Sequence, residues 1–193
     1  MVTERRKARM EEVLANRQTD LTLVCENIHD RHNVSAIFRS CDAVGIPEVH
    51  LFYHIEKFPK IGNKSSSSAK KWIDIHQHCD PDSLKNALKN KGLKIYTTHL
   101  SEEAVSIYDV DWTRPSAIIL GNEHRGVSPL ALEIADQNVY IPMFGMIQSL
   151  NVSVAAAVIL YEIGRQRILK GCYPNPRLTP DIREDWLNDW LER

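Results

Sequence analysis

Apolar and polar positions along this chain form two kinds of pattern, short apolar runs and segments with helical spacing, and these alternate along the sequence. Short apolar runs typical of buried strands occur at 21–26 (LTLVCE), 48–53 (EVHLFY), 72–76 (WIDIH), 94–100 (KIYTTHL), 116–120 (SAIIL) and 138–143 (NVYIPM). Between and around them, helical spacing predicts helices at 3–17, 34–44, 81–91 and 151–170, and capping residues predict two more that begin at Pro129 and at Pro180. Strands that alternate with helices in this way indicate an α/β fold with a mostly parallel sheet flanked by helices.

Helix start and stop residues support these boundaries. The residue pairs Asp80–Pro81, Ser128–Pro129 and Thr179–Pro180 each place a capping side chain before a proline that suits the first helical turn. Gly45 and Gly92 stand where two of the helices are expected to end.

The predicted helix at 34–44 has an apolar face and a polar one. Its apolar face comprises Val34, Ile37, Phe38, Cys41 and Val44, and its polar face is expected to carry Ser35, Arg39 and Asp42. Arg39 has two interpretations at this point, an ion pair with Asp42 three residues on, or a contact to a phosphate or ribose oxygen.

Composition and charge exclude several classes of protein. The 193 residues carry 24 Lys and Arg against 25 Asp and Glu, so a wholly basic nucleic-acid coat is excluded, and a polyanion would need a local basic patch. The apolar run at 150–161 is shorter than the roughly 20 residues of a membrane-spanning helix. Four scattered cysteines and a charged N-terminal segment without an apolar leader favour a cytoplasmic protein.

Two stretches without acidic residues could provide such a patch. One is 57–71 (KFPKIGNKSSSSAKK), with five lysines, and the other is 163–177, which includes Arg165 and Arg167. A solvated surface and an RNA-binding surface are equally consistent with this composition.

Several well-known chemical motifs are missing. The eight glycines form no G-x-G, which argues against an ordinary Rossmann cofactor site. The segment GNEHRGVS at 121–128 has the glycine spacing of a phosphate-binding loop but Val127 in place of the lysine. The clusters CENIHDRH and HQHC do not supply four zinc ligands at a recognised spacing, so no metal site is expected.

Two further stretches place polar residues at positions where α/β proteins bind ligands. In IILGNEHRGVS, at 118–128, a buried strand ends at Gly121 and polar residues follow at once. In IPMFGMIQSLNVSVAAAVILYE, at 141–162, Ser149 and Asn151 stand at the entrance of an apolar helix. Such an entrance can bind a ligand through free backbone N–H groups, or it can be a plain cap.

These stretches, taken with Asn33 and Arg39, resemble the SPOUT superfamily of RNA methyltransferases and closely the tRNA (guanosine 18) 2'-O-ribose methyltransferases. The resemblance covers nearly the whole chain, and MIQSLNVSVAAAVILYE is its most specific part. It implies a deep trefoil knot in the C-terminal half, S-adenosyl-L-methionine as cofactor, tRNA as substrate and a homodimer whose active site draws on both subunits. It also implies one knotted catalytic core at 21–170 within a single domain, with helical extensions at 1–20 and 171–193.

The resemblance also assigns roles to individual residues. The catalytic group is expected to be Arg39, Asn33, Ser149 and Asn151. The cofactor site is expected to comprise Thr98, Gly121, Glu123, Ile141, Met146, Leu150 and Asn151. RNA contacts are expected from Arg5, Arg6, Lys7, Arg9, Lys64, Lys70, Lys71, Arg165 and Arg167, and should weaken as salt rises.

Three alternatives stay open on the sequence. The substrate could be another tRNA position or ribosomal RNA, because the motifs serve all of these substrates. The chain could be an RNA-binding module without turnover. The alternating strands alone would also suit a flavodoxin-like small-molecule binder.

Overall fold

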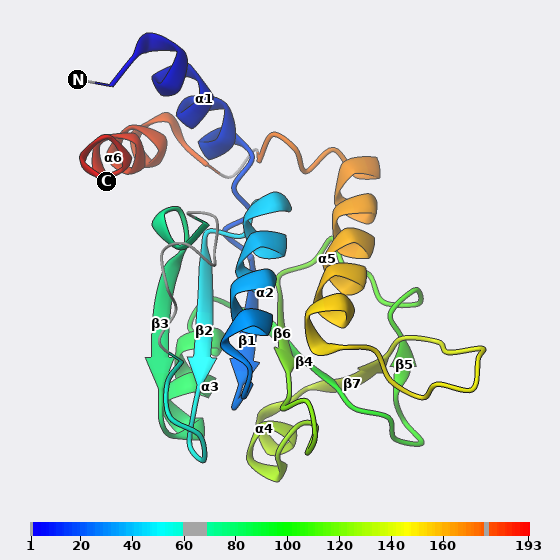
Figure 1. The fold of residues 1–193 in the computed structure, drawn as a ribbon. Coiled ribbons are helices and arrows are strands. Elements are labelled where there is room, and N and C mark those ends of the chain that lie inside the picture. The colour runs from blue at the N-terminus through cyan, green and yellow to red at the C-terminus, as the bar shows by residue number, and fades with distance from the viewer. Residues whose placement is uncertain (1, 60–68, 176–177) are drawn as a thin grey trace.

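A single sheet of seven strands forms the centre of the molecule, in the spatial order β3-β2-β1-β6-β4-β7-β5 (Figure 1). In this computed structural model, which describes residues 2–59, 69–175 and 178–193, the strands are β1 Leu21–Glu26, β2 Glu48–Phe52, β3 Asp74–His78, β4 Lys94–Thr98, β5 Val105–Ser106, β6 Ser116–Leu120 and β7 Gln137–Tyr140. Every one of these neighbouring pairs is parallel. The predicted α/β fold with a mostly parallel sheet is therefore confirmed, and the trefoil knot stays a prediction.

Helices cover both faces of the sheet. The helices are α1 Glu4–Ala15, α2 Arg31–Ala43, the short 3-10 helix η1 Ala69–Lys71, α3 Pro81–Lys89, α4 Pro129–Ile134, α5 Val152–Leu169 and α6 Pro180–Glu192. Side chains of α2 and α5 pack with one face in the larger core, and side chains of α3 and α4 pack with the other face in a second core. The sheet is thus buried on both sides, as parallel sheets are.

The first and last helices pack against each other away from the sheet (Figure 1). Met10 and Leu14 of α1 and Trp190 of α6 are buried together in a small apolar cluster, and Trp72 packs against them. Arg17, which follows α1, lies under the Trp190 ring and donates to Asp42 of α2 over 2.7 Å. This cluster therefore connects both end helices to the sheet domain.

The helix ends follow the capping signals of the sequence. Asp80, Ser128 and Thr179 each accept a hydrogen bond from a backbone N–H in the first turn of their helix, as predicted. Beyond the end of α2, Gly45 has φ +83, and the N–H groups of Gly45 and Ile46 donate to the carbonyls of Asp42 and Cys41. This is a Schellman motif, in which the left-handed position favours glycine.

Some details differ from the sequence prediction. The strand expected at 72–76 lies at Asp74–His78, because Trp72 belongs to the cluster with Trp190 and pairing with β2 begins only at Asp74. Ser35, expected on the polar face of α2, is buried, because that helix packs against both the sheet and α5. The strand β5 and the helix η1 were not predicted.

Parallel strands place their carboxyl ends at one edge of the sheet, and three of the expected cofactor residues lie at these ends. Thr98 ends β4, Gly121 follows β6 and Ile141 follows β7. None of the described helices is long and apolar enough to cross a lipid bilayer.

Candidate functional site

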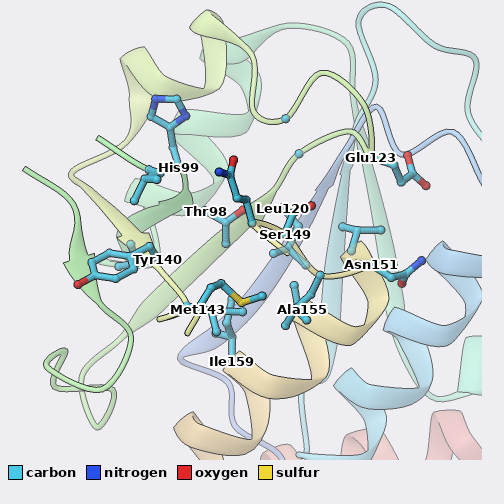
Figure 2. A pocket seen from close by; sticks show the side chains of 18 of the residues that line it. Thr98, His99, Leu120, Glu123, Tyr140, Met143, Ser149, Asn151, Ala155 and Ile159 are labelled. Atoms are coloured by element: carbon cyan, nitrogen blue, oxygen red, sulfur yellow. The ribbon is translucent and has the colours of Figure 1, made fainter. Parts of the chain in front are cut away.

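A pocket of about 880 Å³ opens at this carboxyl edge, between the ends of β4, β6 and β7 and the start of α5 (Figure 2). The predicted cofactor residues Thr98, Gly121, Glu123, Ile141, Leu150 and Asn151 line it, together with the predicted catalytic residue Ser149. Figure 2 shows Glu123 and Asn151 on the side of α2, and His99 and Tyr140 on the opposite side. Residues more than 50 positions apart in the sequence thus meet around one cavity.

The loop that precedes α5 lies partly outside the pocket. The side chain of Met146, predicted as a cofactor contact, is 98% exposed and does not line the cavity, and Phe144 is equally exposed. Met143 and Gly145 of the same loop line the pocket instead.

The loop after β6 is tightly folded. Asn122 and Gly126 exchange two backbone hydrogen bonds of 2.9 Å, and Gly126 has φ +69. A Cβ atom on Gly121 would lie 2.3 Å from the carbonyl carbon of Gly126. Only glycine fits at Gly121, so the two glycines of this segment shape the pocket wall and do not form a phosphate-binding loop.

Three of the predicted site residues form one hydrogen-bonded chain. Asn151 donates from Nδ2 to Oδ1 of Asn33 over 3.2 Å, and Asn33 donates from Nδ2 to Oε1 of Glu123 over 2.9 Å. These residues come from the start of α5, the first turns of α2 and the loop after β6. The two hydrogen bonds therefore connect the three segments that the sequence singled out.

Glu123 anchors the segment that leads into α2. Its carboxylate accepts backbone N–H groups of His29 over 2.9 Å and of Asp30 over 3.2 Å, in addition to the amide of Asn33. Burial raises the pKa of Glu123, but the hydrogen bonds from Asn33 and from the backbone outweigh it and leave the pKa below its usual value. Glu123 is therefore a carboxylate at neutral pH, which suits it to hold other groups in place.

Asn151 is a cap, as one of the two interpretations of the sequence predicted, and it also contacts a second helix. Its Oδ1 caps α5 by accepting from the backbone N–H of Ser153 over 2.9 Å, while its Nδ2 reaches Asn33. The cap therefore does not exclude a role in the site.

Arg39 lies on α2 with its side chain exposed, and it does not line the pocket of its own chain. The alternative partner suggested for it, Asp42, accepts instead from Arg17. The structure therefore does not bring Arg39 together with Ser149 and the cofactor residues within one chain.

The predicted RNA contacts fall into different surroundings. Arg5, Arg6, Lys7, Lys70 and Lys71 are exposed, whereas Lys64 lies outside the described residues. Arg9 is exposed and pairs with Glu12, and Arg165 is exposed and pairs with Glu162.

The predicted RNA contact of Arg167 is wrong. Its side chain is buried, and the guanidinium donates to Asp20 over 2.6 Å, to Gln18 over 2.8 Å and to the carbonyl of Trp112. A buried guanidinium that fastens α5 to the start of β1 cannot contact RNA. The acid-free stretch concealed this role, because the partner Asp20 is distant in the sequence.

Several further residues of the pocket were not predicted from the sequence. His99, Tyr140, Met143 and Ile159 line it. Their places at strand ends could have indicated two of them, because His99 directly follows Thr98, the end of β4, and Tyr140 ends β7. Among the described residues, no group of three or more His, Cys, Asp and Glu side chains is arranged to hold a metal ion.

Comparisons with known proteins show which family the chain resembles. Residues 20–161 match the family model of the SpoU rRNA methylase family. The chain is 47% identical over 191 residues to the tRNA (guanosine(18)-2'-O)-methyltransferase of Thermus thermophilus, covering 99% of this chain and 98% of the relative.

Two solved structures are similar as well. The TrmH/SpoU tRNA modifying enzyme of A. aeolicus aligns with a TM-score of 0.90 at 42% identity, over 98% of this chain and 96% of that protein. The SpoU methyltransferase AviRb from Streptomyces viridochromogenes, in complex with the cofactor AdoMet, aligns with a TM-score of 0.69 at 26% identity, over 78% of this chain and 59% of that protein.

Proposed function

The chain belongs to the SpoU rRNA methylase family, and from this membership we propose that it methylates the 2'-hydroxyl of guanosine 18 in tRNA with S-adenosylmethionine as cofactor. One observation carries the proposal: the 47% identity to a tRNA (guanosine(18)-2'-O)-methyltransferase extends over 99% of this chain, and so includes α1 and α6 as well as the pocket. The end helices matter because the catalytic motifs are common to methyltransferases with other RNA substrates.

The pocket fits the proposed cofactor. Its volume of about 880 Å³ lies within the range of roughly 300–1,000 Å³ for small-molecule sites. Ile141, Leu150 and Ile159 offer an apolar wall for a base, and the loop at Gly121 brings backbone groups close to the cavity. When bound, S-adenosylmethionine supplies a methyl group that its positively charged sulfur makes electrophilic.

The protein must then align the ribose 2'-oxygen, whose proton passes to solvent water when the oxygen is methylated. We assign alignment to Asn33, Ser149 and Asn151, with Glu123 holding Asn33 in place. Arg39 has a guanidinium, which is a hydrogen-bond donor at all ordinary pH values. It therefore binds the ribose and its adjoining phosphate and stabilises the oxyanion that develops on the 2'-oxygen. Arg39→Lys would keep the positive charge but lose the bidentate hydrogen bonding of the guanidinium. Near-wild-type turnover of this variant would therefore contradict the role assigned to Arg39.

A homodimer completes the proposal. Val154, Tyr161 and Ile168 are 48%, 63% and 67% exposed and are spaced seven residues apart on α5, so they lie on one helix face. Tyr161 and Ile168 also line a groove of about 610 Å³ shared with α1 and the end of α2. We assign this face to a second copy of the chain, which would also let Arg39 act in the pocket of the other subunit. Sedimentation equilibrium should give about twice the chain mass of 22.1 kDa, and the mass of one chain would contradict the dimer.

RNA binding is assigned to basic side chains outside the pocket, namely Arg5, Arg6, Lys7, Arg9, Lys70, Lys71 and Arg165. The first four belong to α1 or lie at its start, which gives the helical extension a role beside the knotted core of a single domain. Affinity for tRNA should fall steeply as salt rises, and a flat salt dependence would contradict this surface.

We place the enzyme in the cytoplasm, where its proposed substrate is found. Exclusion of the protein from the cytosolic fraction of cells would contradict this location.

The deciding experiment is transfer of labelled methyl from S-adenosylmethionine to an unmodified tRNA transcript. The matched control is the same tRNA with 2'-deoxyguanosine at position 18, which lacks the acceptor oxygen. Label in the first RNA only would support reaction, atom and position together. Label in both would place the target elsewhere in the tRNA. Label in neither would lead to ribosomal RNA, and cofactor binding without any transfer would indicate an RNA-binding module.

A further inference from the structure

An exposed ion pair joins two loops at the rim of the pocket. Arg125, in the loop after β6, donates from Nη2 to Oε1 of Glu56 over 2.7 Å. The other carboxylate oxygen of Glu56 lies 3.8 Å from Nδ1 of His29, in the segment that leads into α2. The side chains of Arg125 and His29 are 50% and 72% exposed, so both neighbours of Glu56 remain accessible to a ligand.

The backbone beneath this ion pair is firmly held. Oδ1 of Asn27 accepts the backbone N–H groups of His54, Ile55 and Glu56 at 3.0–3.2 Å. Oδ1 of Asn122 likewise accepts the N–H groups of His124 and Arg125.

The two asparagines are also connected, because Nδ2 of Asn122 donates to the carbonyl of Asn27 over 2.7 Å. Asn27 has φ +46, a left-handed conformation that Asn tolerates better than most residues. The backbone of Glu56 and that of Arg125 are thus held by one connected set of hydrogen bonds.

Stability of the fold does not account for this arrangement. Exposed ion pairs contribute little to the free energy of unfolding, and the backbone hydrogen bonds to Asn27 and Asn122 already hold both loops. A guanidinium beside an imidazole, with a carboxylate bridging them, instead matches the way proteins bind a phosphate through two of its oxygens. Arg125 is two residues from Glu123, which lines the pocket and holds the start of α2.

We propose that Arg125 and His29 form a binding site for a backbone phosphate of the RNA substrate, and that Glu56 occupies this site in the free protein and is displaced when RNA binds. The inference rests on the proposed function, since it requires an RNA substrate. It adds Arg125 and His29 to the RNA-binding surface, and it makes Glu56 a competitor that disfavours binding of RNAs unable to place a phosphate there. The exchange costs little, because one charge-assisted contact to Arg125 replaces another.

A double-mutant cycle tests the exchange. Equilibrium binding of a fluorescently labelled unmodified tRNA transcript is measured by anisotropy for the wild type, Glu56→Gln, Arg125→Gln and the double variant. Glu56→Gln should bind roughly three- to tenfold more tightly, because a neutral amide competes with the phosphate for Arg125 less well than a carboxylate does. Arg125→Gln should bind more weakly and lower the slope of log affinity against log salt by about one. In the double variant the gain from Glu56→Gln should disappear.

Glu133→Gln is the matched control, since it makes the same substitution at an exposed position on α4, which packs on the opposite face of the sheet from α2. It should leave tRNA affinity near the wild-type value, and melting temperatures should show that all variants are folded. Unchanged or weaker binding by Glu56→Gln, an equal gain in Glu133→Gln, or a gain that persists without Arg125 would each overturn the proposal. Methyl transfer by the wild type is scored separately. Its absence would refute the proposed function, whereas the binding cycle would still decide the phosphate site.

Discussion

The side-chain amide of Asn33 donates a hydrogen bond to one neighbour and accepts one from another. Substitutions that change only one of these atoms can therefore test the two contacts separately. Nδ2 donates to the Glu123 carboxylate and Oδ1 accepts from Asn151. Asn33→Asp is nearly isosteric but would set a second carboxylate against Glu123. We expect it to lower kcat at pH 8 roughly tenfold more than Asn33→Ala does, a difference of about 1.4 kcal/mol in activation free energy. Steady-state methyl transfer on tRNA measures the effect.

The pH dependence separates repulsion from simple loss of a side chain. A carboxylate at position 33 beside Glu123 should have a raised pKa, and once protonated it can donate to Glu123 as the amide does. The activity of Asn33→Asp relative to the wild type should therefore recover as pH falls toward 5.5, whereas that of Asn33→Ala should not. Equal activity of Asn33→Asp and the wild type at pH 8 would show that the contact with Glu123 is dispensable.

The sequence indicated which residues belong to the pocket better than how they interact. Thr98, Gly121 and Ile141 were predicted from their places in the motifs of the resembled family, and in the structure each ends or directly follows a strand and lines the pocket. The contact between Asn33 and Asn151 spans 118 positions, so no local pattern contains it. Met146 was predicted by its place in a motif, but its side chain points outward in a loop whose conformation the motif does not determine.

The last turns of α5 contain two arginines with opposite surroundings, and these form a natural pair of variants. Arg167 is buried against Asp20 and Gln18, whereas Arg165 is exposed beside Glu162. Arg167→Met removes one member of a buried ion pair and should lower the free energy of unfolding by about 3–5 kcal/mol. Arg165→Met should leave it nearly unchanged. Chemical denaturation of both variants measures the difference.

Binding of tRNA should show the opposite order. Among folded molecules, Arg165→Met should weaken binding at low salt and Arg167→Met should not, because its guanidinium is inaccessible. If Arg167→Met were as stable as the wild type and bound tRNA poorly, the structural role assigned to Arg167 would be wrong.

Three histidines stack across β2 and β3 and should make stability depend on pH. The ring of His50 lies between those of His76 and His78, with centroids 5.0 and 5.1 Å apart. Burial, together with the neighbouring His50 and His76, lowers the pKa of His78 to about 4. In the unfolded chain a histidine has a pKa of about 6.5, so between pH 6.5 and 4 the unfolded state binds the proton and the folded state does not.

Stability should consequently fall as pH is lowered through this interval. Between pH 7 and pH 5, His78 alone should account for a loss of about 2 kcal/mol, measured by urea denaturation at each pH. In His78→Gln this part of the pH dependence should vanish, while His32→Gln, at an exposed histidine, should retain it. A wild-type stability that is constant from pH 7 to 5 would contradict the lowered pKa.

Elements were predictable where local chemistry determines them. The caps at Asp80, Ser128 and Thr179 and the glycine end of α2 depend on neighbouring residues only, and all were found in the structure. The strand β5 spans two residues, too few to show a period, and its pairing with β7 depends on the tertiary fold. Ser35 is buried for the same reason, because α2 packs against both α5 and the sheet.

Mixed dimers test the proposed assembly of the whole enzyme. Arg39→Ala should abolish activity through the ribose contact, and Leu150→Glu should abolish it by placing a charge in the pocket wall. If each active site combines Arg39 of one chain with the pocket of the other, a dimer containing one copy of each variant has one intact site. Co-refolding the two inactive variants should restore roughly a quarter of wild-type activity, since about half of the dimers are mixed and each has one site of two.

The alternative gives a different result. If Arg39 serves the pocket of its own chain, every site in the mixture contains one defect and no activity returns. Mixing either variant with itself provides the background. Tyr161→Glu, on the exposed face of α5, should prevent the rescue by blocking dimer formation.

The order of strands in the sheet also determines when the site can form. Strand β1 pairs with the central strand β6, whose first residue is 95 positions after that of β1, and α2 packs against α5, which begins at Val152. Contacts so distant in sequence make folding slow, because a long loop must close before they stabilise it. During synthesis the N-terminal strands must therefore wait, partly unpaired, until most of the chain has left the ribosome. Asn33 can meet Asn151 only at that late stage, so the nascent protein forms the hydrogen bond between them among its last contacts.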